Sequence, residues 1–150
     1  MNNLLLVAEL IAYVANPIEI GTTQYGQRRL IPIIGGTARG PLIRGAILPG
    51  GADFQIIRSD GVAELQARYA ISLESGGLLY VENTGLRHGP PEIMAKLQRG
   101  EEVDPALIYF RTVPRFETAE PDYRWLTRHI FVASGARRPK QVELSIFQVL

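Results

Sequence analysis

The sequence predicts an all-β protein with a single short helix, and three observations lead to this fold class. Short runs of alternating apolar and polar residues recur along the chain, separated by turn signals rich in glycine. Asp60-Gly61 and Gly76-Gly77 are strong hairpin signals, because both residues of a tight turn must tolerate positive φ. Only one stretch has a convincing helical pattern. About eight or nine strands at this spacing indicate a sandwich or a barrel, and closure into a barrel removes exposed edges.

The first element is the apolar run Leu4–Val14, which we interpret as a strand. A helix is the alternative, because apolar runs of this length are ambiguous. The run is too short to cross a bilayer, and it lacks the basic flank and the cleavage site of a signal peptide. We therefore expect a cytoplasmic protein.

The segment that follows is predicted as a loop and two strands. Asn16–Gln27 carries proline and glycine and is expected to be a loop. Arg28–Ile34 and Ala38–Leu48 are expected to be strands joined by a turn at Gly35-Gly36. This turn brings the chain toward its most informative part.

The central part of the chain is predicted to be a three-stranded meander. Its strands are Ala52–Arg58, Val62–Leu73 and Leu78–Asn83. If Asp60-Gly61 is a two-residue loop, counting outward places Asp53 opposite Arg68. The same count around Gly76-Gly77 places Asn83 opposite Ala70. Because opposed residues share a face, this register assembles one polar and one apolar surface.

The two predicted surfaces of the meander differ in chemistry. The polar surface consists of Asp53, Gln55, Gln66, Arg68 and Asn83. The apolar surface consists of Phe54, Ile56, Leu65, Ala67, Tyr69, Ile71 and Leu73. A different turn length would exchange the faces, since side chains alternate along a strand.

A helix is predicted at Pro91–Arg99, within a crossover loop. Proline suits the first helical turn, Glu92 and Lys96 are spaced to pair, and Gly100 is placed to end the helix. Its expected buried residues are Ile93 and Leu97.

Strand patterns resume after the helix. The predicted strands are Leu107–Val113, Tyr123–Ala133 and Val142–Leu150, with a basic loop at Ser134–Lys140. In the second of these, alternation places Tyr123, Trp125, Thr127 and His129 on one face. In the last, Val142, Leu144 and Ile146 alternate with polar residues.

Composition excludes several classes of protein. With 150 residues, the chain is expected to form one domain, spanning residues 1–150, with a substantial core. The net charge is +1 and the basic residues are scattered, which argues against nucleic-acid and membrane partners. There is no cysteine, so disulfides and thiolate chemistry are excluded.

The sequence gives little support for cofactor or metal chemistry. Its glycine-rich stretches lack the motifs of phosphate-binding loops, and turns explain them better. The two histidines, His88 and His129, lack ligand spacing, and no serine lies in a nucleophile elbow. We therefore expect no metal and no cofactor.

The polar surface of the meander is the strongest candidate site. Arg68 could bind an anionic or enolate oxygen, while Asp53 accepts a proton or orients the substrate. Aromatic walls and further polar groups would come from outside that surface. The candidate catalytic residues are Asp53, Arg68 and His129, and the candidate ligand-binding residues are Asn83, Tyr109, Arg111 and Trp125. The alternative is a solvated face with a cross-strand ion pair, as is normal for antiparallel sheets.

Short motifs spread over nearly the whole chain resemble the domain of unknown function 3237 family, also called uncharacterised protein family 0311. The motifs are Gly50-Gly51-Ala52-Asp53-Phe54, Asp60-Gly61, Ala67-Arg68-Tyr69, Asn83-x-Gly85-x-Arg87, Tyr109-Phe110-Arg111-Thr112, Phe116-Glu117-Thr118 and Tyr123-x-Trp125-Leu126. Phe54 and Thr127 depart from the tryptophan and asparagine expected there. The resemblance implies an antiparallel β-barrel of about eight to ten strands with lipocalin-like appearance, and an oligomeric protein.

Three functions are compatible with these observations. The first is a cofactor-free isomerase or lyase that transfers protons next to the carbonyl of a small organic molecule held in the barrel. The second is a carrier that uses the same pocket without chemistry. The third is a structural protein whose apolar sheet face joins copies of itself.

Overall fold

The computed structural model describes residues 3–150, which form ten strands, one α-helix and two 3-10 helices. The strands are β1 (Leu4–Val14), β2 (Ile18–Thr23), β3 (Gly26–Arg39), β4 (Gly45–Ile47), β5 (Gly51–Ile57), β6 (Ala63–Leu73), β7 (Leu78–His88), β8 (Tyr109–Thr118), β9 (Phe131–Arg137) and β10 (Gln141–Val149). The helices are α1 (Pro91–Gln98), η1 (Pro105–Leu107) and η2 (Pro121–Arg128).

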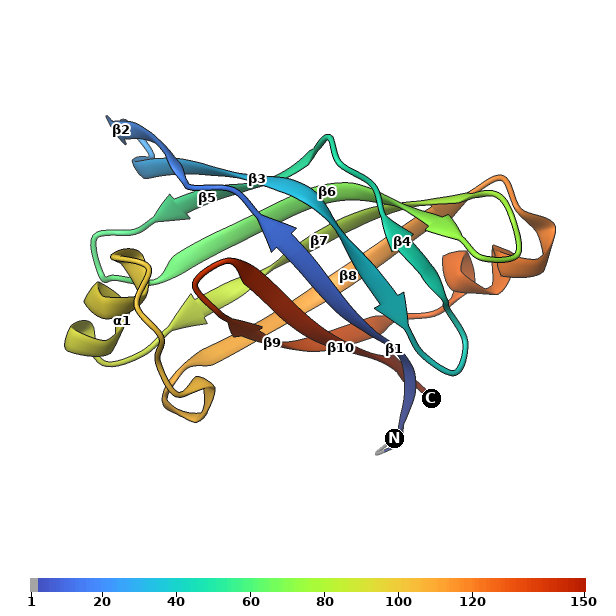
Figure 1. Cartoon of the computed structure of the whole chain (residues 1–150). Coiled ribbons are helices and arrows are strands. Elements are labelled where there is room, and N and C mark those ends of the chain that lie inside the picture. Colours follow the sequence, from blue (N-terminus) through green and yellow to red (C-terminus); the bar gives the residue numbers. More distant parts are fainter. Residues whose placement is uncertain (1–2) are drawn as a thin grey trace.

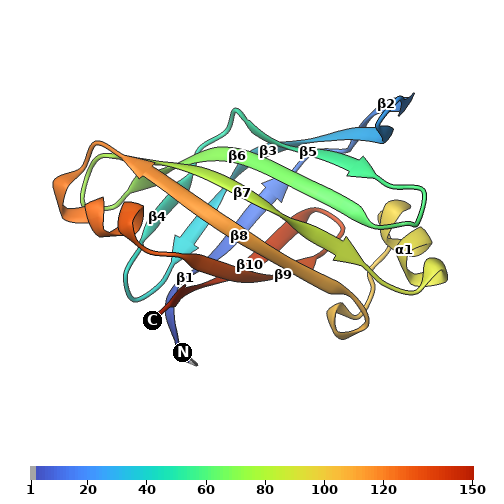
Figure 2. The same cartoon turned by 180° about the vertical axis from the view of Figure 1, so that it is seen from behind.

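These strands form a closed antiparallel barrel, as the sequence predicts. Neighbouring strands follow the order β1, β10, β9, β8, β7, β6. β4 and β5 each pair with β6 on one side and with β3 on the other. β1 pairs with β10 on one side and β3 on the other, which closes the ring. Figures 1 and 2 show the barrel from opposite sides, with α1 at one end and η2 at the other.

Several predicted elements are confirmed. The first apolar run is the strand β1, and the predicted helix is α1. The connection that contains α1 joins the adjacent antiparallel strands β7 and β8, so it is not the crossover expected from the sequence. Gly100 follows α1 with a φ of +79°, the conformation that glycine adopts most readily. Met94 and Leu97 are the buried residues of the helix, whereas Ile93 is only partly buried. No helix in residues 3–150 has the length and apolar character needed to cross a membrane.

The turn predicted at Gly35-Gly36 is wrong, because both glycines lie inside β3. β3 exchanges its neighbours there: β2 and β5 flank its first half, and β1 and β4 flank its second half. The φ of Gly36 is +151°, and a Cβ on it would lie 2.1 Å from the carbonyl oxygen of Ile11. Gly36 therefore lets β1 and β3 approach closely where the ring closes.

Three further boundaries differ from the prediction. The loop predicted at 16–27 contains β2, which forms a hairpin with β3. The predicted strand at 123–133 begins instead with η2, which has Pro121 at its first position and buries Leu126. The predicted basic loop at 134–140 is mostly strand, because β9 extends to Arg137 and pairs with β10.

The two hairpins of the meander have a register that the sequence analysis predicts wrongly. Arg58 and Val62 are joined by a backbone hydrogen bond of 2.9 Å, so Ser59, Asp60 and Gly61 form a three-residue loop. Gly61 has a φ of +88°, and the Asp60 carboxylate accepts a hydrogen bond from the Val62 amide. Three-residue loops of this kind place glycine in the left-handed conformation.

This loop shifts the pairing of β5 and β6 by one residue. Asp53 lies opposite Ala67, and Arg68 lies opposite Ala52. The turn between β6 and β7 is also longer than expected, so Asn83 faces Ala67 rather than Ala70. Asp53 and Asn83 still share a face, but that face also carries the apolar residues of β6 and points into the barrel.

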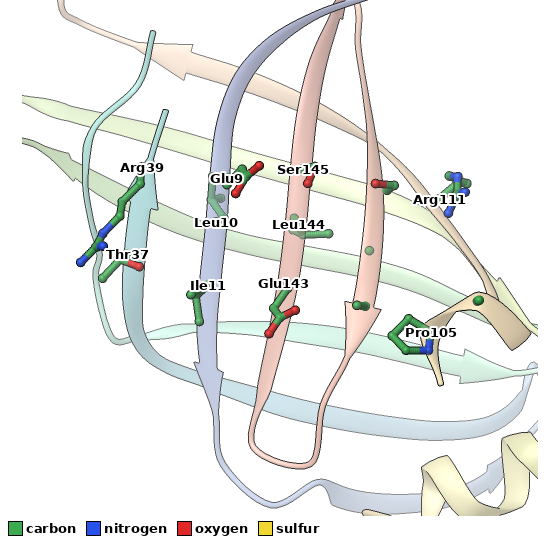
Figure 3. Close-up of a pocket in the computed structure, with 14 residues that line it drawn as sticks. Glu9, Leu10, Ile11, Thr37, Arg39, Pro105, Arg111, Glu143, Leu144 and Ser145 are labelled. Carbon is green, nitrogen blue, oxygen red and sulfur yellow. The ribbon is translucent and has the colours of Figure 1, made fainter. Parts of the chain in front are cut away.

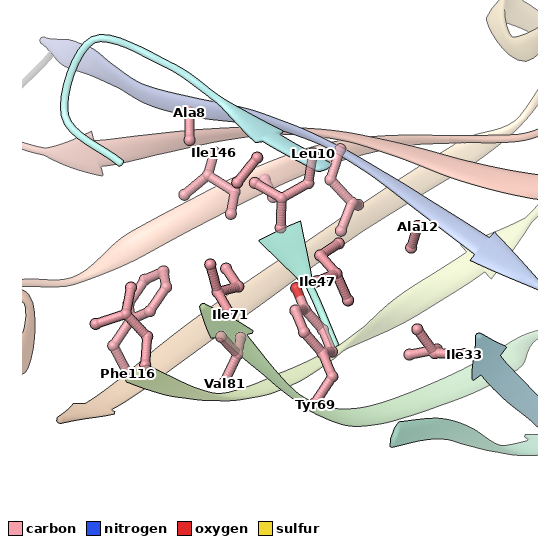
Figure 4. Packing of buried hydrophobic residues seen from close by; sticks show 14 of the residues in the cluster. Ala8, Leu10, Ala12, Ile33, Ile47, Tyr69, Ile71, Val81, Phe116 and Ile146 are labelled. Carbon is pink, nitrogen blue, oxygen red and sulfur yellow. The ribbon is translucent and has the colours of Figure 1, made fainter. Parts of the chain in front are cut away.

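The barrel interior has two chemically different ends. The end near η2, here called the apolar end, is filled by fully buried side chains, including Val7, Leu10, Ile71, Leu79, Phe131 and Ile146. Figure 4 shows Leu10, Ile71, Val81 and Ile146 converging inside the ring. The end near α1, here called the polar end, contains the buried polar residues Arg29, Gln55, Asn83, Arg87 and Thr112. The apolar end supplies the hydrophobic stabilisation, and the polar end concentrates the buried polar side chains.

Replacing Gly36 with alanine is expected to destabilise the barrel strongly. The Cβ would overlap the Ile11 carbonyl, and the positive φ would be strained. Together these effects should cost about 3 kcal/mol or more, equivalent to roughly 6–12 °C in Tm. Thermal unfolding followed by circular dichroism measures the change.

Gly21→Ala is the matched control for this substitution. Gly21 also has a positive φ, +110°, but no atom lies within 4 Å of the position its Cβ would take. The Gly21→Ala variant should therefore lose only about 1–3 kcal/mol of unfolding free energy, from backbone strain. Equal losses in the two variants would contradict the close approach of β1 and β3 as the reason for Gly36.

Candidate functional site

A narrow cavity of about 50 Å³ lies inside the polar end of the barrel. Its apolar walls include Ile31, Ile33, Leu65, Phe110 and Val142. Its polar lining consists of Asp53, Gln55, Tyr69, Asn83, Arg87, Thr112 and Arg137. A buried water needs about 10–15 Å³ on this scale, so the cavity holds a molecule of only a few non-hydrogen atoms.

Five buried polar atoms of residues 3–150 lack a hydrogen-bond partner, and all five belong to residues that line this cavity. They are Gln55 Oε1, Tyr69 Oη, Asn83 Oδ1, Arg87 Nε and Thr112 Oγ1. They come from four strands: β5, β6, β7 and β8. Buried polar groups are nearly always satisfied in folded proteins, so their concentration around one space identifies a candidate binding site.

Asp53 is the acidic group of the cavity. Its Oδ2 accepts a hydrogen bond of 2.8 Å from Gln55 Nε2, and its Oδ1 accepts one of 3.0 Å from the Gln66 amide. Burial raises the pKa of the Asp53 carboxyl above 3.8, although these hydrogen bonds and the charges of Arg87 and Arg137 act in the opposite direction. The carboxyl is therefore a stronger base than an exposed aspartate.

Arg87 is the most completely buried cation of the site, with a relative exposure of 4%. Its guanidinium carbon lies 5.4 Å from the centroid of the Phe110 ring, a cation–π geometry. Burial lowers the pKa of Arg87 to about 10, and the neighbouring charges of Arg137 and Arg29 act in the same direction. Arg87 nevertheless remains charged at neutral pH.

Two other arginines complete the charge distribution. Arg29 forms an ion pair of 2.8 Å with Glu19 of β2, so its charge is compensated. Arg137 donates a hydrogen bond of 2.8 Å to the Arg138 carbonyl, which fixes its position. Burial lowers the pKa of Arg137, and Arg29 contributes in the same direction. The cavity therefore has more positive than negative charge in its surroundings.

Two of the residues selected from sequence lie in this cavity, and Arg68 does not. Asp53 and Asn83 are brought together on the interior face of β5 and β7. Arg68 is exposed on the outer face of β6, opposite Glu82 of β7. The predicted pairing of Asp53 with Arg68 is wrong, because the three-residue loop places their side chains on opposite faces.

The remaining selected residues lie on the outside of the barrel or at its other end. Tyr109 is exposed and stacks on His88 with ring centroids 5.0 Å apart. Arg111 is exposed and its Nη1 donates to the Phe110 carbonyl. Trp125 packs against the apolar core from η2, and His129 is exposed beside it. None of these four residues lines the cavity.

Arg111 lines a wider groove on the outer face of β1, β9 and β10, shown in Figure 3. The groove has a volume of about 730 Å³ and exists because small residues such as Ser134, Ala136 and Ser145 lie there. None of the five unpartnered buried atoms lines it. Its Glu143 is already engaged by Gln141 and Arg138. The interior cavity is therefore the stronger candidate.

No cluster of three or more metal-ligating side chains occurs within residues 3–150. In the cavity itself the only carboxylate is Asp53, and it faces arginines. The donor set of the cavity consists of hydroxyl, amide and guanidinium groups, which suits an organic ligand better than a cation.

The sequence model of the family described as "Protein of unknown function (DUF3237)" matches residues 2–149. The chain belongs to the DUF3237 family. A UPF0311 protein from Rhodopseudomonas palustris strain TIE-1 is 54% identical over 132 residues, which cover 88% of this chain and 84% of that protein. A second UPF0311 protein, from Bradyrhizobium diazoefficiens, is 50% identical over 144 residues, which cover 96% and 94%. The family resemblance predicted from the motifs is confirmed.

Solved structures of DUF3237 relatives and one distant protein share the barrel. A Rhodopseudomonas palustris protein of unknown function has a TM-score of 0.93 and 47% identity, covering 100% of this chain and 99% of that chain. A protein from Acinetobacter baumannii, described as beta-barrel like, has a TM-score of 0.85 and 38% identity, covering 97% and 94%. A chain described as an enzyme from Penicillium herquei has a TM-score of 0.70 at 16% identity, covering 96% and 93%, and so shares the fold.

The sequence analysis missed several residues of the cavity. Arg87 lies four positions after Asn83 in β7. Because side chains alternate along a strand, the sequence could have placed both residues on the same face. Thr112 lies on the face opposite Arg111 in β8, which the same alternation indicates. Tyr69 belongs to the predicted apolar surface of the meander, whose β6 residues do face the interior, whereas its β5 residues Phe54 and Ile56 lie on the outer face. Arg137 gave no such signal, because its segment looked like a loop.

Asp53→Asn is expected to be at least as stable as the wild type at pH 7. Because the folded-state pKa of Asp53 lies above its ordinary value of 3.8, folding favours the protonated carboxyl. The wild type therefore loses stability as pH rises through the raised pKa, and the variant avoids this loss. The difference in unfolding free energy between the variant and the wild type should shrink as pH falls below about 4. Urea unfolding at a series of pH values measures it.

Asp60→Asn provides a control of opposite sign. The hydrogen bond from Arg58 lowers the pKa of Asp60, so its ionised form stabilises the turn above the ordinary pKa. This variant should be less stable than the wild type at pH 7 and should approach it in acid. If Asp53→Asn behaved like Asp60→Asn, the pairing of Asp53 with the arginines would outweigh its burial.

Proposed function

We propose that the protein binds a small organic molecule in the polar end of the barrel and exchanges a proton with it through Asp53. The observation that carries the binding proposal is the set of five unpartnered buried polar atoms around one cavity. Each such group costs about 1–3 kcal/mol when it remains unpaired.

Polar groups at this cost are best explained by a bound partner that satisfies them. The cavity combines apolar walls with a few convergent polar groups, as is usual for small-molecule sites. Its volume limits the bound part to a few non-hydrogen atoms, unless strands separate to admit more. The fold is compatible with catalysis, since the Penicillium herquei protein that shares it is described as an enzyme.

Asp53 supports proton transfer as the reaction. The carboxylate would accept a proton from a carbon next to a carbonyl group, and the resulting negative charge on oxygen would be stabilised by Arg87. Reprotonation at another atom would give isomerisation, and loss of a leaving group would give elimination. The raised pKa of Asp53 suits this role, because a general base works best when its pKa approaches the working pH. In the absence of an ion pair with Arg68, nothing on the outer face lowers it.

Hydrogen exchange tests the proposal without knowledge of the product. The protein is incubated in D₂O with a panel of small ketones, keto acids and hydroxy acids, and proton NMR follows the hydrogens next to the carbonyl. Wild type should accelerate exchange in at least one compound. Asp53→Asn should slow this exchange by about 100-fold or more, the usual contribution of a general base. Binding of the same compound, measured by thermal shift, should persist.

Arg87→Gln and Arg115→Gln form a matched pair for the role of the interior cation. Arg115 is exposed on the outer face of β8, so its replacement should leave exchange unchanged. Arg87→Gln should lose both exchange and the thermal shift. If Arg68→Gln lost exchange and thermal shift while Arg87→Gln kept them, Arg68 would again be the cation of the site, as the sequence predicts. A ligand that binds without exchange would contradict catalysis and favour a carrier, and absence of any thermal shift across the panel would contradict binding.

A further inference from the structure

Resting on the proposed function, we infer that the ligand is a small carboxylate that carries a hydroxyl group, with the carboxylate held by Arg87. Three independent features of the cavity lead to this class. They are the balance of charge, the geometry of the Arg87 guanidinium, and the ratio of unpaired donors to unpaired acceptors.

The charge balance requires an anion. Arg29 is compensated by Glu19, which leaves Arg87 and Arg137 facing the single carboxyl of Asp53. With Asp53 ionised, one positive charge remains without a partner, and protonation of Asp53 increases the excess. Arg87 is buried and Arg137 is partly buried, so water screens their charges less than at the surface, and an anionic ligand would be stabilised here more than a neutral one.

The orientation of Arg87 selects a planar anion. The Phe110 ring lies against the guanidinium, 5.4 Å from centroid to Cζ, so that ring occupies one face of the group. The Nε–H is buried and has no partner within residues 3–150. The edge that carries Nε is therefore available, and this edge matches the two oxygens of a carboxylate in one plane.

The other unpaired groups call for a hydroxyl beside the carboxylate. Tyr69 and Thr112 have hydroxyls that can donate to carboxylate oxygens. Gln55 Oε1 and Asn83 Oδ1 accept hydrogen bonds and cannot be satisfied by a carboxylate. The Gln55 amide has its orientation fixed, because its Nε2 donates to Asp53. A ligand hydroxyl supplies the missing donor.

The cavity volume sets the size of the molecule. At about 50 Å³, the space suits a compound of the size of glycolate. Larger homologues such as lactate would have to place their extra carbon against Ile31 or Leu65. Phosphate offers a tetrahedral arrangement of oxygens in place of the planar pair, and it lacks a carbon skeleton for the apolar walls.

Three small probes separate these features. Glycolate has both groups, acetate lacks the hydroxyl, and glycolamide lacks the charge. Isothermal titration should show the tightest binding for glycolate. Acetate should bind about tenfold more weakly, because it lacks the one hydroxyl hydrogen that glycolate can donate to Gln55 Oε1 or Asn83 Oδ1, and glycolamide should bind more weakly still. Phosphate should not compete. In a nitrogen-edited NMR spectrum, glycolate should shift the Nε–H signal of Arg87, identified by its absence in Arg87→Gln.

Two substitutions test where the ligand binds. Because there are two, the test still works if one of the variants fails to fold. Arg87→Gln should abolish glycolate binding, and Tyr69→Phe, which removes only a hydroxyl, should weaken it about tenfold. Arg115→Gln should have no effect. Unchanged binding in Tyr69→Phe and Arg87→Gln would overturn the inference.

Other outcomes distinguish this inference from the proposed function. If glycolamide binds as tightly as glycolate, the inference of a carboxylate falls while the interior site stands. If acetate equals glycolate, the role of the hydroxyl falls. If none of the probes binds but the exchange panel yields another ligand, this inference alone is overturned. If neither the probes nor the panel gives a ligand, both are overturned.

Discussion

The closed ring of strands restricts every side chain to one of two environments. Side chains alternate along a strand, so each residue of the ring points either into the barrel or away from it. An interior enclosed by about eight strands is wide enough for side chains to fill it or to leave room for one small ligand. A polar residue on the inner face is removed from most of the surrounding water, as Arg87 is at 4% exposure and Asp53 is in part, and it finds most of its partners inside. The placement of Asp53 and Arg87 therefore depends on closure as much as on their own chemistry.

The two ends of the interior respond to this constraint in different ways. At the apolar end, residues such as Leu10, Ile71 and Ile146 are buried completely and bring hydrophobic stabilisation. At the polar end, Arg87 and Asn83 are almost as deeply buried but retain unpaired atoms. The stability gained at one end offsets the cost of polar groups at the other. Sites that violate ordinary packing rules are where function is expected.

Sequence reasoning reaches the fold but not the register. Alternation, turn glycines and the single helical pattern are local signals, and they predict β1, α1 and an all-β fold that is either a sandwich or a barrel, while the family motifs imply the barrel. The face on which Asp53 lies depends on whether one turn has two or three residues, which the dipeptide Asp60-Gly61 does not decide. Similarly, Gly35-Gly36 has the composition of a turn, and only the crossing of β1 shows why β3 needs glycine there. The alternation of Trp125 and His129 suggested a strand, but Pro121 starts a helix.

The pairing of β1 with β10 has a consequence for how the protein folds. Leu4 lies opposite Val149, so closure joins segments that are separated by nearly the whole chain. Contacts of such long sequence separation form slowly, because the entropy of a large loop is lost before they form. During synthesis, β1 can pair with β3 early, while its other edge waits for the last strand. The interior becomes enclosed only at that final step, so a nascent chain gains its stability and its interior cavity together.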